Sequence, residues 1–301
     1  MKTPNLKDLR LAQENLTKQY RHAHQTQSLS AVERDVYLQA RMPATQTVCE
    51  KVLTKIEQHA GLENKNLDIT SMLDLGCGPG SATIAALQVF PQLQTLHLID
   101  RDANYKYDFD KTYQAQFFKQ NFQQLYLPQA YDLIVLSYAL SECDDRLCEQ
   151  VLNQAWKHTK QYLIVIEPGT PYGYASLLKT RQHLIEQGAF LIAPCPHERV
   201  CPLVAPDWCH FKVRLQRSKI HQQIKQGTKS FEDESYSFGI FSKQPTIIKN
   251  KCIIKKPMVR TGHVLFELCT ADGVQKETVS RKDNTCYLQA KKLEWGDIFQ
   301  C

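Results

Sequence analysis

The sequence predicts an α/β fold: a doubly wound parallel sheet, with a helical segment before it and a cysteine-rich, basic α+β extension after it. Short apolar runs alternate with helical segments between residues 71 and 190. Two runs, Asp132–Leu136 and Tyr162–Ile166, are almost continuously apolar, as in parallel strands buried on both faces. Beyond residue 190, cysteine, proline and basic residues become frequent, which marks the extension.

Residues 1–62 are expected to form an N-terminal helical cap. Val48, Val52 and Ile56 recur at helical spacing. Pro43 precedes them and is expected to break the helical segment into two parts, because proline lacks the N–H that a helix interior uses.

Residues 63–190 are expected to form the core. Its strands are predicted at Met72–Leu75, Leu96–Ile99, Asp132–Leu136 and Tyr162–Ile166, and its helices at Ala82–Val89, Cys148–His158 and Ser176–Gln187. Residues 191–301 form the extension, in which residues 235–242 are expected to return to the core sheet. The remaining predictions for this region are a loop over 193–210, a basic helix over Phe211–Gln226, and a hairpin of His263–Cys269 with Val274–Ser280.

Composition excludes several classes of protein. Hydrophobic residues make up 43% of the 301 residues and charged residues 23%, which is typical of a globular domain. No run of 18 apolar residues occurs, so we expect no membrane span. The polar N-terminus carries no signal or targeting segment, which favours a cytoplasmic protein, or a mitochondrial one only for a eukaryotic relative. In a reducing compartment the 11 cysteines are expected to remain thiols or bind metal.

Basic charge is concentrated in the extension. Residues 191–301 hold 18 Lys and Arg against 11 Asp and Glu, whereas the preceding residues hold 19 against 20. Such asymmetry favours a nucleic-acid-facing extension on a near-neutral core, with a lysine-rich solvated surface as the alternative.

A glycine loop follows the first predicted strand of the core. Gly76, Gly78 and Gly80 stand between that strand and a helix, where glycine lets the backbone approach a ligand closely. Asp100 ends the next strand and could accept hydrogen bonds from ribose hydroxyls. The spacing G-x-G-x-G departs from the dinucleotide fingerprint G-x-G-x-x-G, which disfavours a dinucleotide oxidoreductase.

This loop resembles motif I of class I S-adenosylmethionine-dependent methyltransferases, over roughly residues 70–170. The resemblance implies a Rossmann-like methyltransferase sheet in which the glycines lie under the cofactor, Asp100 holds its ribose and Asp74 orients the loop and the ligand amino group. The acceptor motif Asn/Asp-Pro-Pro-Tyr/Phe of many nucleobase methyltransferases is missing after the fourth strand. Tyr138 and Glu142 stand there instead, as candidates for stacking on a base and for proton transfer, so the catalytic residues stay undetermined.

Three cysteines fall within 15 residues, at Cys195, Cys201 and Cys209. Thiolates at short spacing bind zinc or an iron–sulfur cluster, and the absence of a C-x2-C pair makes a zinc ribbon less favourable. The residues alone leave the fourth ligand open among Cys252, Cys269, Cys286, His197 and His210.

Several motifs occur together with these cysteines. They are Ala193-Pro194-Cys195-Pro196-His197, Cys201-Pro202-Leu203, Asp207-Trp208-Cys209-His210-Phe211, Arg41-Met42-Pro43-Ala44-Thr45, Leu268-Cys269-Thr270-Ala271-Asp272-Gly273 and Trp295-Gly296-Asp297. This set resembles the methyltransferase-like family of mitochondrial small-ribosomal-subunit assembly factors and their bacterial relatives. The resemblance implies a [4Fe–4S] cluster on Cys195, Cys201, Cys209 and Cys269, with zinc as an alternative occupant. It also implies the small ribosomal subunit and its rRNA as partners. We expect the protein to be monomeric off the ribosome.

Two stretches of the extension, Cys209–Ser230 and Lys243–Arg260, are basic and contain no acidic residue, as phosphate binding requires. The predicted RNA-binding residues are Lys212, Arg214, Arg217, Lys255, Lys256 and Arg260. Three functions remain: an rRNA methyltransferase of the small subunit, a non-catalytic rRNA-binding assembly factor, and a small-molecule methyltransferase with structural zinc.

Overall fold

The computed structural model describes residues 5–21, 29–105, 113–246 and 251–300. Its centre is an eight-stranded sheet with strand order β3-β2-β1-β4-β5-β8-β6, in which β7 also pairs with β8. The parallel strands are β1 (Ser71–Leu75), β2 (Thr95–Asp100), β3 (Gln114–Lys119), β4 (Tyr131–Ser137) and β5 (Thr159–Pro168). The predicted doubly wound sheet is therefore confirmed. β3 was not predicted, because Gln114–Lys119 is a half-exposed edge strand without an apolar run.

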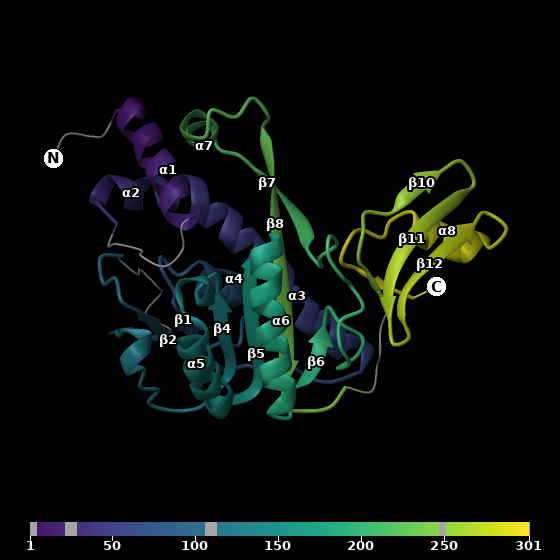
Figure 1. Ribbon diagram of the computed structural model, residues 1–301, viewed down its shortest axis with the longest axis horizontal. Helices are drawn as coiled ribbons and strands as arrows, with labels where there is room; N and C mark the ends of the chain where they lie inside the picture. Colours follow the sequence, from purple (N-terminus) through teal and green to yellow (C-terminus); the bar gives the residue numbers. More distant parts are fainter. Residues whose placement is uncertain (1–4, 22–28, 106–112, 247–250, 301) are drawn as a thin grey trace.

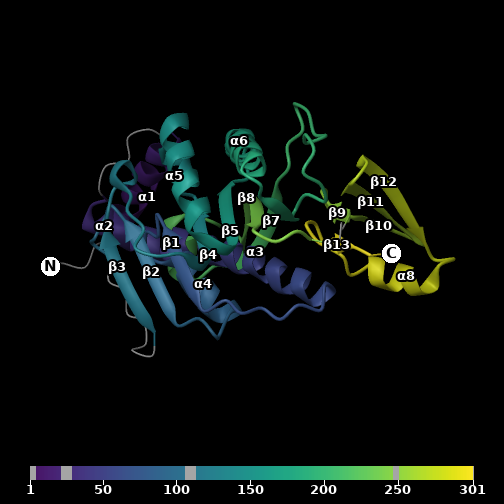
Figure 2. The same cartoon turned by 90° about the horizontal axis from the view of Figure 1, so that it is seen from below.

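Helices cover both faces of this sheet (Figures 1 and 2). One face carries α3 (Met42–Leu62) and α4 (Ser81–Val89), and the other carries α5 (Asp145–His158) and α6 (Pro171–Glu186). Each face has its own apolar core because alternate strand residues point to opposite sides: Ile164 and Ile166 pack toward α3, whereas Leu163 and Val165 pack toward α5. Short 3-10 turns lie at Phe122–Gln124 and Leu140–Glu142.

The sheet is completed by antiparallel strands from the extension. β8 (Phe231–Ser242) pairs with β5, β6 (Phe190–Ala193) and β7 (Phe211–Gln216). The predicted basic helix over Phe211–Gln226 is wrong, because β7 and a short helix α7 (Lys219–Ile224) occupy this segment. Apolar residues alternate with polar ones in β7, so that Phe211 and Leu215 are buried while Lys212 and Arg214 are exposed.

The N-terminal segment is helical, with α1 (Leu6–Arg21), α2 (Ala31–Val36) and a π-helical turn at Tyr37–Arg41 that leads into α3. Pro43 stands in the first turn of α3, where its missing N–H costs no hydrogen bond. Apolar residues of α1 and α2 pack with Ile224 of α7, so the cap rests on the arm formed by β7, α7 and β8 (Figure 1).

A second, antiparallel sheet ends the chain and lies beside the core (Figures 1 and 2). It contains β9 (Lys251–Ile253), β10 (Met258–Arg260), β11 (His263–Thr270), β12 (Gly273–Ser280) and β13 (Ile298–Phe299), with α8 (Asn284–Ala290) packed against it. The predicted β11–β12 hairpin is confirmed. The core of this sheet is small, whereas Cys252, Ile254 and Cys269 belong to the apolar cluster of the main domain. The sheet therefore meets the core through its cysteine-bearing face.

Gly169 joins three segments at the end of β5. Its N–H donates to Ser235 O of β8 at 3.0 Å, and its carbonyl accepts from Trp208 Nε1 at 3.1 Å. A Cβ added at this position would lie 2.5 Å from Tyr236 N. Only glycine therefore allows this close approach of the end of β5 to the backbone of β8.

We predict that Gly169→Ala lowers the free energy of unfolding by about 1–3 kcal/mol, because backbone atoms must move to admit the methyl group. Gly61→Ala is the matched control, since Gly61 lies in α3 with no atom within 4 Å of an added Cβ. That control should raise the free energy of unfolding by less than about 1 kcal/mol. Urea denaturation measures both variants. Equal stability of Gly169→Ala and wild type would contradict the tight approach.

Candidate functional site

The glycine loop lies at the carboxyl end of β1, the edge at which doubly wound sheets bind ligands. Gly76, Gly78 and Gly80 have φ values of 72°, 49° and 84°, a region that favours glycine. A Cβ at Gly76 would lie 2.6 Å from Ala139 Cβ, whereas the space beside Gly78 is open for at least 4 Å. The loop is therefore packed against Ala139 at Gly76 and open at Gly78, where a ligand could approach the backbone.

Asp100 is bound to this loop. Its Oδ2 accepts from Gly78 N at 2.8 Å, and its Oδ1 accepts from Asp102 N at 2.8 Å. Burial raises the pKa of this carboxyl, and the two backbone hydrogen bonds act in the opposite direction. Each carboxylate oxygen can accept a second hydrogen bond, so Asp100 keeps the capacity to accept from two hydroxyls.

Asp74 has an internal role. Its side chain is 1% exposed, and Oδ2 accepts from Thr83 N at 3.1 Å and from Thr83 Oγ1 at 2.8 Å. Burial raises its pKa to about 7. These bonds fix α4 against β1 and so set the position of the glycine loop between them.

Tyr138 follows β4 and adopts a φ of 58°, which is uncommon for a residue with a side chain. Its hydroxyl is buried and has no hydrogen-bond partner among the described residues. The next residue, Ala139, touches Gly76, so Tyr138 lies next to the glycine loop. Strain and an unpartnered hydroxyl at this edge are typical of functional positions. The side chain of the second candidate, Glu142, lies outside the described residues.

Sequence reasoning missed a contribution from the helical cap. The π-helical turn places Tyr37 near the glycine-loop site. Burial raises the pKa of Tyr37; the charge of Arg41 lowers this pKa, and the charge of Asp100 raises it. Its ring lies 6.5 Å from that of Tyr105, centroid to centroid. π-helical turns occur frequently at functional sites, but no sequence pattern distinguishes this turn from the surrounding α-helix.

The four cysteines implied by the family resemblance line a single pocket between the core and the second sheet, although Cys209 and Cys269 are far apart in sequence. Cys195, Cys201, Cys209 and Cys269 all contribute to its wall. Apolar side chains make up most of the rest of the lining, among them Leu177, Phe238, Phe241 and Ile254. In the described part of the chain, no three Cys, His, Asp or Glu side chains are arranged to hold a single metal ion.

Polar contacts fix the segment that carries three of these cysteines. Arg181 of α6 donates through Nη2 to the carbonyls of His197 and Arg199, both at 2.7 Å. Tyr174 Oη lies 3.1 Å from Cys201 Sγ, and Ser237 Oγ donates to Cys209 O at 2.7 Å. The core sheet and α6 therefore determine where these thiols stand.

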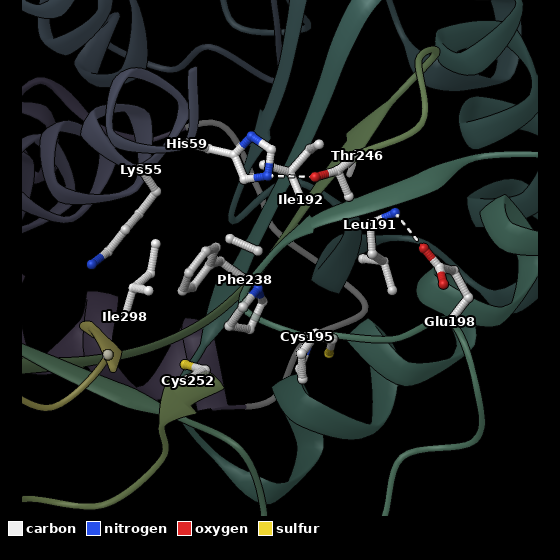
Figure 3. Close-up of a pocket in the computed structure, with 14 residues that line it drawn as sticks. Lys55, His59, Leu191, Ile192, Cys195, Glu198, Phe238, Thr246, Cys252 and Ile298 are labelled. Carbon is white, nitrogen blue, oxygen red and sulfur yellow. Dashed lines mark hydrogen bonds between the residues drawn. The ribbon is translucent and has the colours of Figure 1, made fainter. Parts of the chain in front are cut away.

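The other candidates for a fourth ligand lie elsewhere. Cys252 pairs with Cys269 across β9 and β11, yet it lines a neighbouring pocket together with Lys55 and Cys195 (Figure 3). His197 and His210 are absent from the lining of the four-cysteine pocket. Cys286 is disulfide-bonded, so the expectation that the cysteines remain thiols or bind metal is wrong at this position, while nine other described cysteines form no disulfide.

A buried ion pair lies beside this junction. Lys55 Nζ of α3 is 3.3 Å from Asp297 Oδ1, and Lys55 is 4% exposed. Burial lowers the pKa of this lysine, whereas Asp297 raises it. Removing one partner would leave a buried charge, so this pair holds the second sheet in place on α3.

The predicted RNA-binding residues divide into two groups. Arg214 pairs with Asp233 at 2.6 Å, Arg217 with Glu232 at 3.2 Å and Lys255 with Glu267 at 3.1 Å. Within the described residues, Lys212, Lys256 and Arg260 are exposed and form no ion pair, although Lys212 lies over the Trp295 ring.

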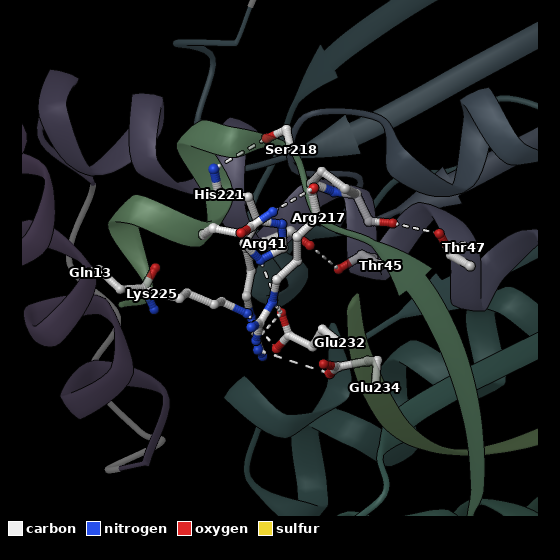
Figure 4. Close-up of polar contacts among 12 residues, drawn as sticks. Gln13, Arg41, Thr45, Thr47, Arg217, Ser218, His221, Lys225, Glu232 and Glu234 are labelled. Carbon is white, nitrogen blue, oxygen red and sulfur yellow. Dashed lines mark hydrogen bonds and ion pairs between the residues drawn. The ribbon is translucent and has the colours of Figure 1, made fainter. Parts of the chain in front are cut away.

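Figure 4 shows why Arg217 is poorly placed for phosphate contacts. Glu232 accepts from Arg217, from His221 Nε2 at 2.9 Å and from Lys225 Nζ at 2.7 Å. These partners lower the pKa of Glu232 to about 2 despite its burial. These contacts hold α7 on β8. The Arg217 side chain is only 13% exposed, so little of it can reach a phosphate.

No helix in the described residues is both long and apolar enough to cross a membrane. Among solved structures, the magnesium protoporphyrin IX methyltransferase of Synechocystis PCC 6803 is similar to this chain, with 12% identity, a TM-score of 0.41, and coverage of 79% of this chain and 100% of that one. An O-methyltransferase family protein of Burkholderia thailandensis has 12% identity, a TM-score of 0.43, and coverage of 79% and 71%. TM-scores of 0.41 and 0.43 give no information on the ligand or the reaction of this chain.

Sequence relatives are more informative. The human mitochondrial ribosome assembly protein METTL17 is 25% identical over 289 residues, covering 87% of this chain and 61% of the human protein. The mitochondrial Rsm22-cox11 tandem protein 2 of Schizosaccharomyces pombe is 24% identical over 323 residues. The match covers 87% of this chain and 42% of the yeast protein. The chain thus spans between about two fifths and three fifths of these relatives. Residues 31–300 match the family model described as mitochondrial small ribosomal subunit Rsm22. The chain therefore belongs to the Rsm22/METTL17 family of mitochondrial small-subunit assembly factors, which have a methyltransferase-like fold.

Proposed function

We propose that this chain is an assembly protein of the small ribosomal subunit that binds S-adenosylmethionine, holds a [4Fe–4S] cluster and contacts rRNA. The observation that supports it most is the meeting of Cys195, Cys201, Cys209 and Cys269 in one pocket, in a chain of the Rsm22 family. The pocket lies between the core and the second sheet, so one cluster would fix the position of the second sheet on the core.

The cofactor proposal relies on the glycine loop. The positive φ values of its three glycines and the open space beside Gly78 suit a ligand that lies on the backbone. Asp100 can receive the ribose hydroxyls while it holds Gly78. These residues fit S-adenosylmethionine, which when bound supplies an electrophilic methyl group.

The cluster proposal relies on the chemistry of the donor set. Four cysteine sulfurs in apolar surroundings are the usual ligands of a [4Fe–4S] cluster. A cluster fills the space between its ligands, so its thiolates stand further apart than those around a zinc ion, whose Zn–S bonds are about 2.3 Å. No single-ion arrangement occurs among the described residues, so metal analysis of the protein has to decide between a cluster and zinc.

The enzymatic part of the proposal is rRNA methylation. Tyr138 lies beside the glycine loop and is the candidate side chain for contact with an acceptor base. A second candidate function is rRNA binding without catalysis. It is favoured because the Tyr138 hydroxyl is buried and therefore cannot readily exchange a proton with an acceptor.

The rRNA surface is proposed to use the exposed residues Lys212, Lys256 and Arg260 rather than Arg217, whose charge is matched by Glu232. Phosphate binding gains most from cations whose charge is not already neutralised.

We predict that Asp100→Ala weakens S-adenosylmethionine binding at least about tenfold, or about 1.4 kcal/mol, because hydrogen bonds to a carboxylate are lost. Asp102→Ala is the control, since it removes a nearby carboxylate that does not contact Gly78. Isothermal titration calorimetry measures both. Wild-type affinity in Asp100→Ala would exclude Asp100 from the cofactor site.

The ligand assignment is tested by Cys269→Ser and Cys252→Ser, two buried thiols opposite each other in neighbouring strands. In protein purified without oxygen, we expect Cys269→Ser to lose most of its iron and to lower the melting temperature, because metal binding stabilises the folded state. Cys252→Ser should retain its iron. The reverse result would make Cys252 the ligand, and metal loss only on replacing His197 or His210 would indicate a mixed zinc site.

For the RNA surface, we expect Lys256→Ala combined with Arg260→Ala to weaken binding to small-subunit rRNA. The slope of log affinity against log salt should become shallower by about one to two, since two phosphate contacts are lost. Lys179→Ala, an exposed lysine of α6 paired with Asp145, should leave the slope unchanged. Filter binding over a salt series measures this. Failure of wild-type protein to bind rRNA would favour a small-molecule methyltransferase.

A further inference from the structure

Two cysteines lie together in the connection between β4 and α5, away from the four-cysteine pocket. Cys143 follows the 3-10 turn Leu140–Glu142, and Cys148 lies in the first turns of α5. Cys148 Sγ is 3.4 Å from Leu140 O and 3.8 Å from Cys143 O. Cys148 Sγ therefore lies within 4 Å of the backbone of Cys143, and the Cys143 side chain is the largest influence on the pKa of Cys148.

The pKa of Cys148 is lowered from its usual value. The hydrogen bond from Cys143 lowers the pKa of Cys148, and Lys179 acts in the same direction, against burial, Asp144 and Asp145. Among the described cysteines the resolved pKa shifts are otherwise upward, at Cys49, Cys195, Cys209, Cys252 and Cys269. Cys148 is also partly exposed, whereas Cys143 is buried. Exposure and thiolate character together determine which thiol reacts.

Glu167 at the end of β5 is a further titratable group beside Cys148. It is 1% exposed, and neither carboxyl oxygen has a hydrogen-bond partner that meets normal geometry among the described residues. Burial, and then Cys148, raise the pKa of Glu167 to about 8. A charged Cys148 therefore favours the neutral form of this carboxyl group.

We propose that Cys148 is a modification site for hydroperoxides and that Cys143 is its resolving thiol. The Cys148 thiolate attacks the peroxide, so that an S–O bond forms, the O–O bond breaks and, after protonation, water or an alcohol leaves. The Cys143 thiol then attacks the resulting sulfenic acid. An S–S bond forms, the S–O bond breaks and water is released, so the two thiols are oxidised by two electrons and the peroxide is reduced.

This disulfide would change the connection that carries Tyr138. The Cys148 thiol would no longer donate to Leu140 O, which lies one residue beyond Ala139, the contact of Gly76. The proposal does not depend on S-adenosylmethionine, on the cluster or on RNA, because its thiols lie outside all three proposed sites.

Peptide mapping tests this directly in the full chain. Reduced protein is treated with an equimolar amount of hydrogen peroxide, blocked with N-ethylmaleimide and digested with trypsin, which cleaves after Arg146 between the two cysteines. We expect a disulfide-linked pair of peptides containing Cys143 and Cys148. Cys143→Ser should instead accumulate a Cys148 sulfenic acid that dimedone traps.

Cys49→Ser is the matched control, because Cys49 is a buried thiol outside the pair, and the linked peptides should form in it as in wild type. In Cys148→Ser, Cys143 should stay reduced. The proposal is overturned if Cys148 oxidises no faster than Cys49, if Cys148 links to another cysteine, or if dimedone traps as much Cys148 in wild type as in Cys143→Ser. Circular dichroism confirms that each variant is folded before treatment.

Discussion

The attachment of the second sheet to the methyltransferase-like core is the constraint on which the rest of the molecule depends. That sheet has a small apolar core of its own and meets the main domain through Cys252, Ile254 and Cys269. Across the junction stand the thiols of the segment between β6 and β7, and beside it lies the buried Lys55–Asp297 pair. A group bound by the four cysteines would thus tie the cysteine segment and the second sheet together at this apolar junction.

This arrangement separates two tasks within one chain. The parallel part of the sheet presents the glycine loop, Asp100 and Tyr138 at its carboxyl edge, and the helical cap adds Tyr37. The extension supplies exposed cations such as Lys256 and Arg260 on the second sheet. Gly169 lies between these regions, because it bonds both to β8 and to the cysteine segment. The proposed metal centre would therefore act on the position of the RNA surface rather than on the cofactor loop.

Local patterns predicted the parts of the fold that depend on local chemistry. The buried strands and the glycine loop could be identified because apolar runs and glycine spacing are direct consequences of burial and of positive φ. β7 was mistaken for a helix because its charged residues dominated the composition, although Phe211 and Leu215 alternate as a strand requires. β3 escaped prediction because an exposed edge strand needs no apolar run.

Pairing between distant residues was beyond sequence reasoning. Arg217 was predicted to bind RNA from its charge alone, whereas Glu232 of the neighbouring strand lies against it and matches that charge. The π-helical turn that brings Tyr37 to the site leaves no mark in the sequence. The four cysteine positions came from a family resemblance, and spacing alone left the fourth ligand open. The fold brings these four side chains to one pocket, while their role as ligands stays a prediction.

The central claim is that four thiols hold one iron–sulfur cluster between the core and the second sheet. Mössbauer spectroscopy of iron-enriched wild-type protein, purified without oxygen, tests it most directly. We expect the spectrum of a single [4Fe–4S] cluster, with about four irons and about four acid-labile sulfides per chain. Folded anaerobic protein that contains only zinc, or no metal at all, would contradict it.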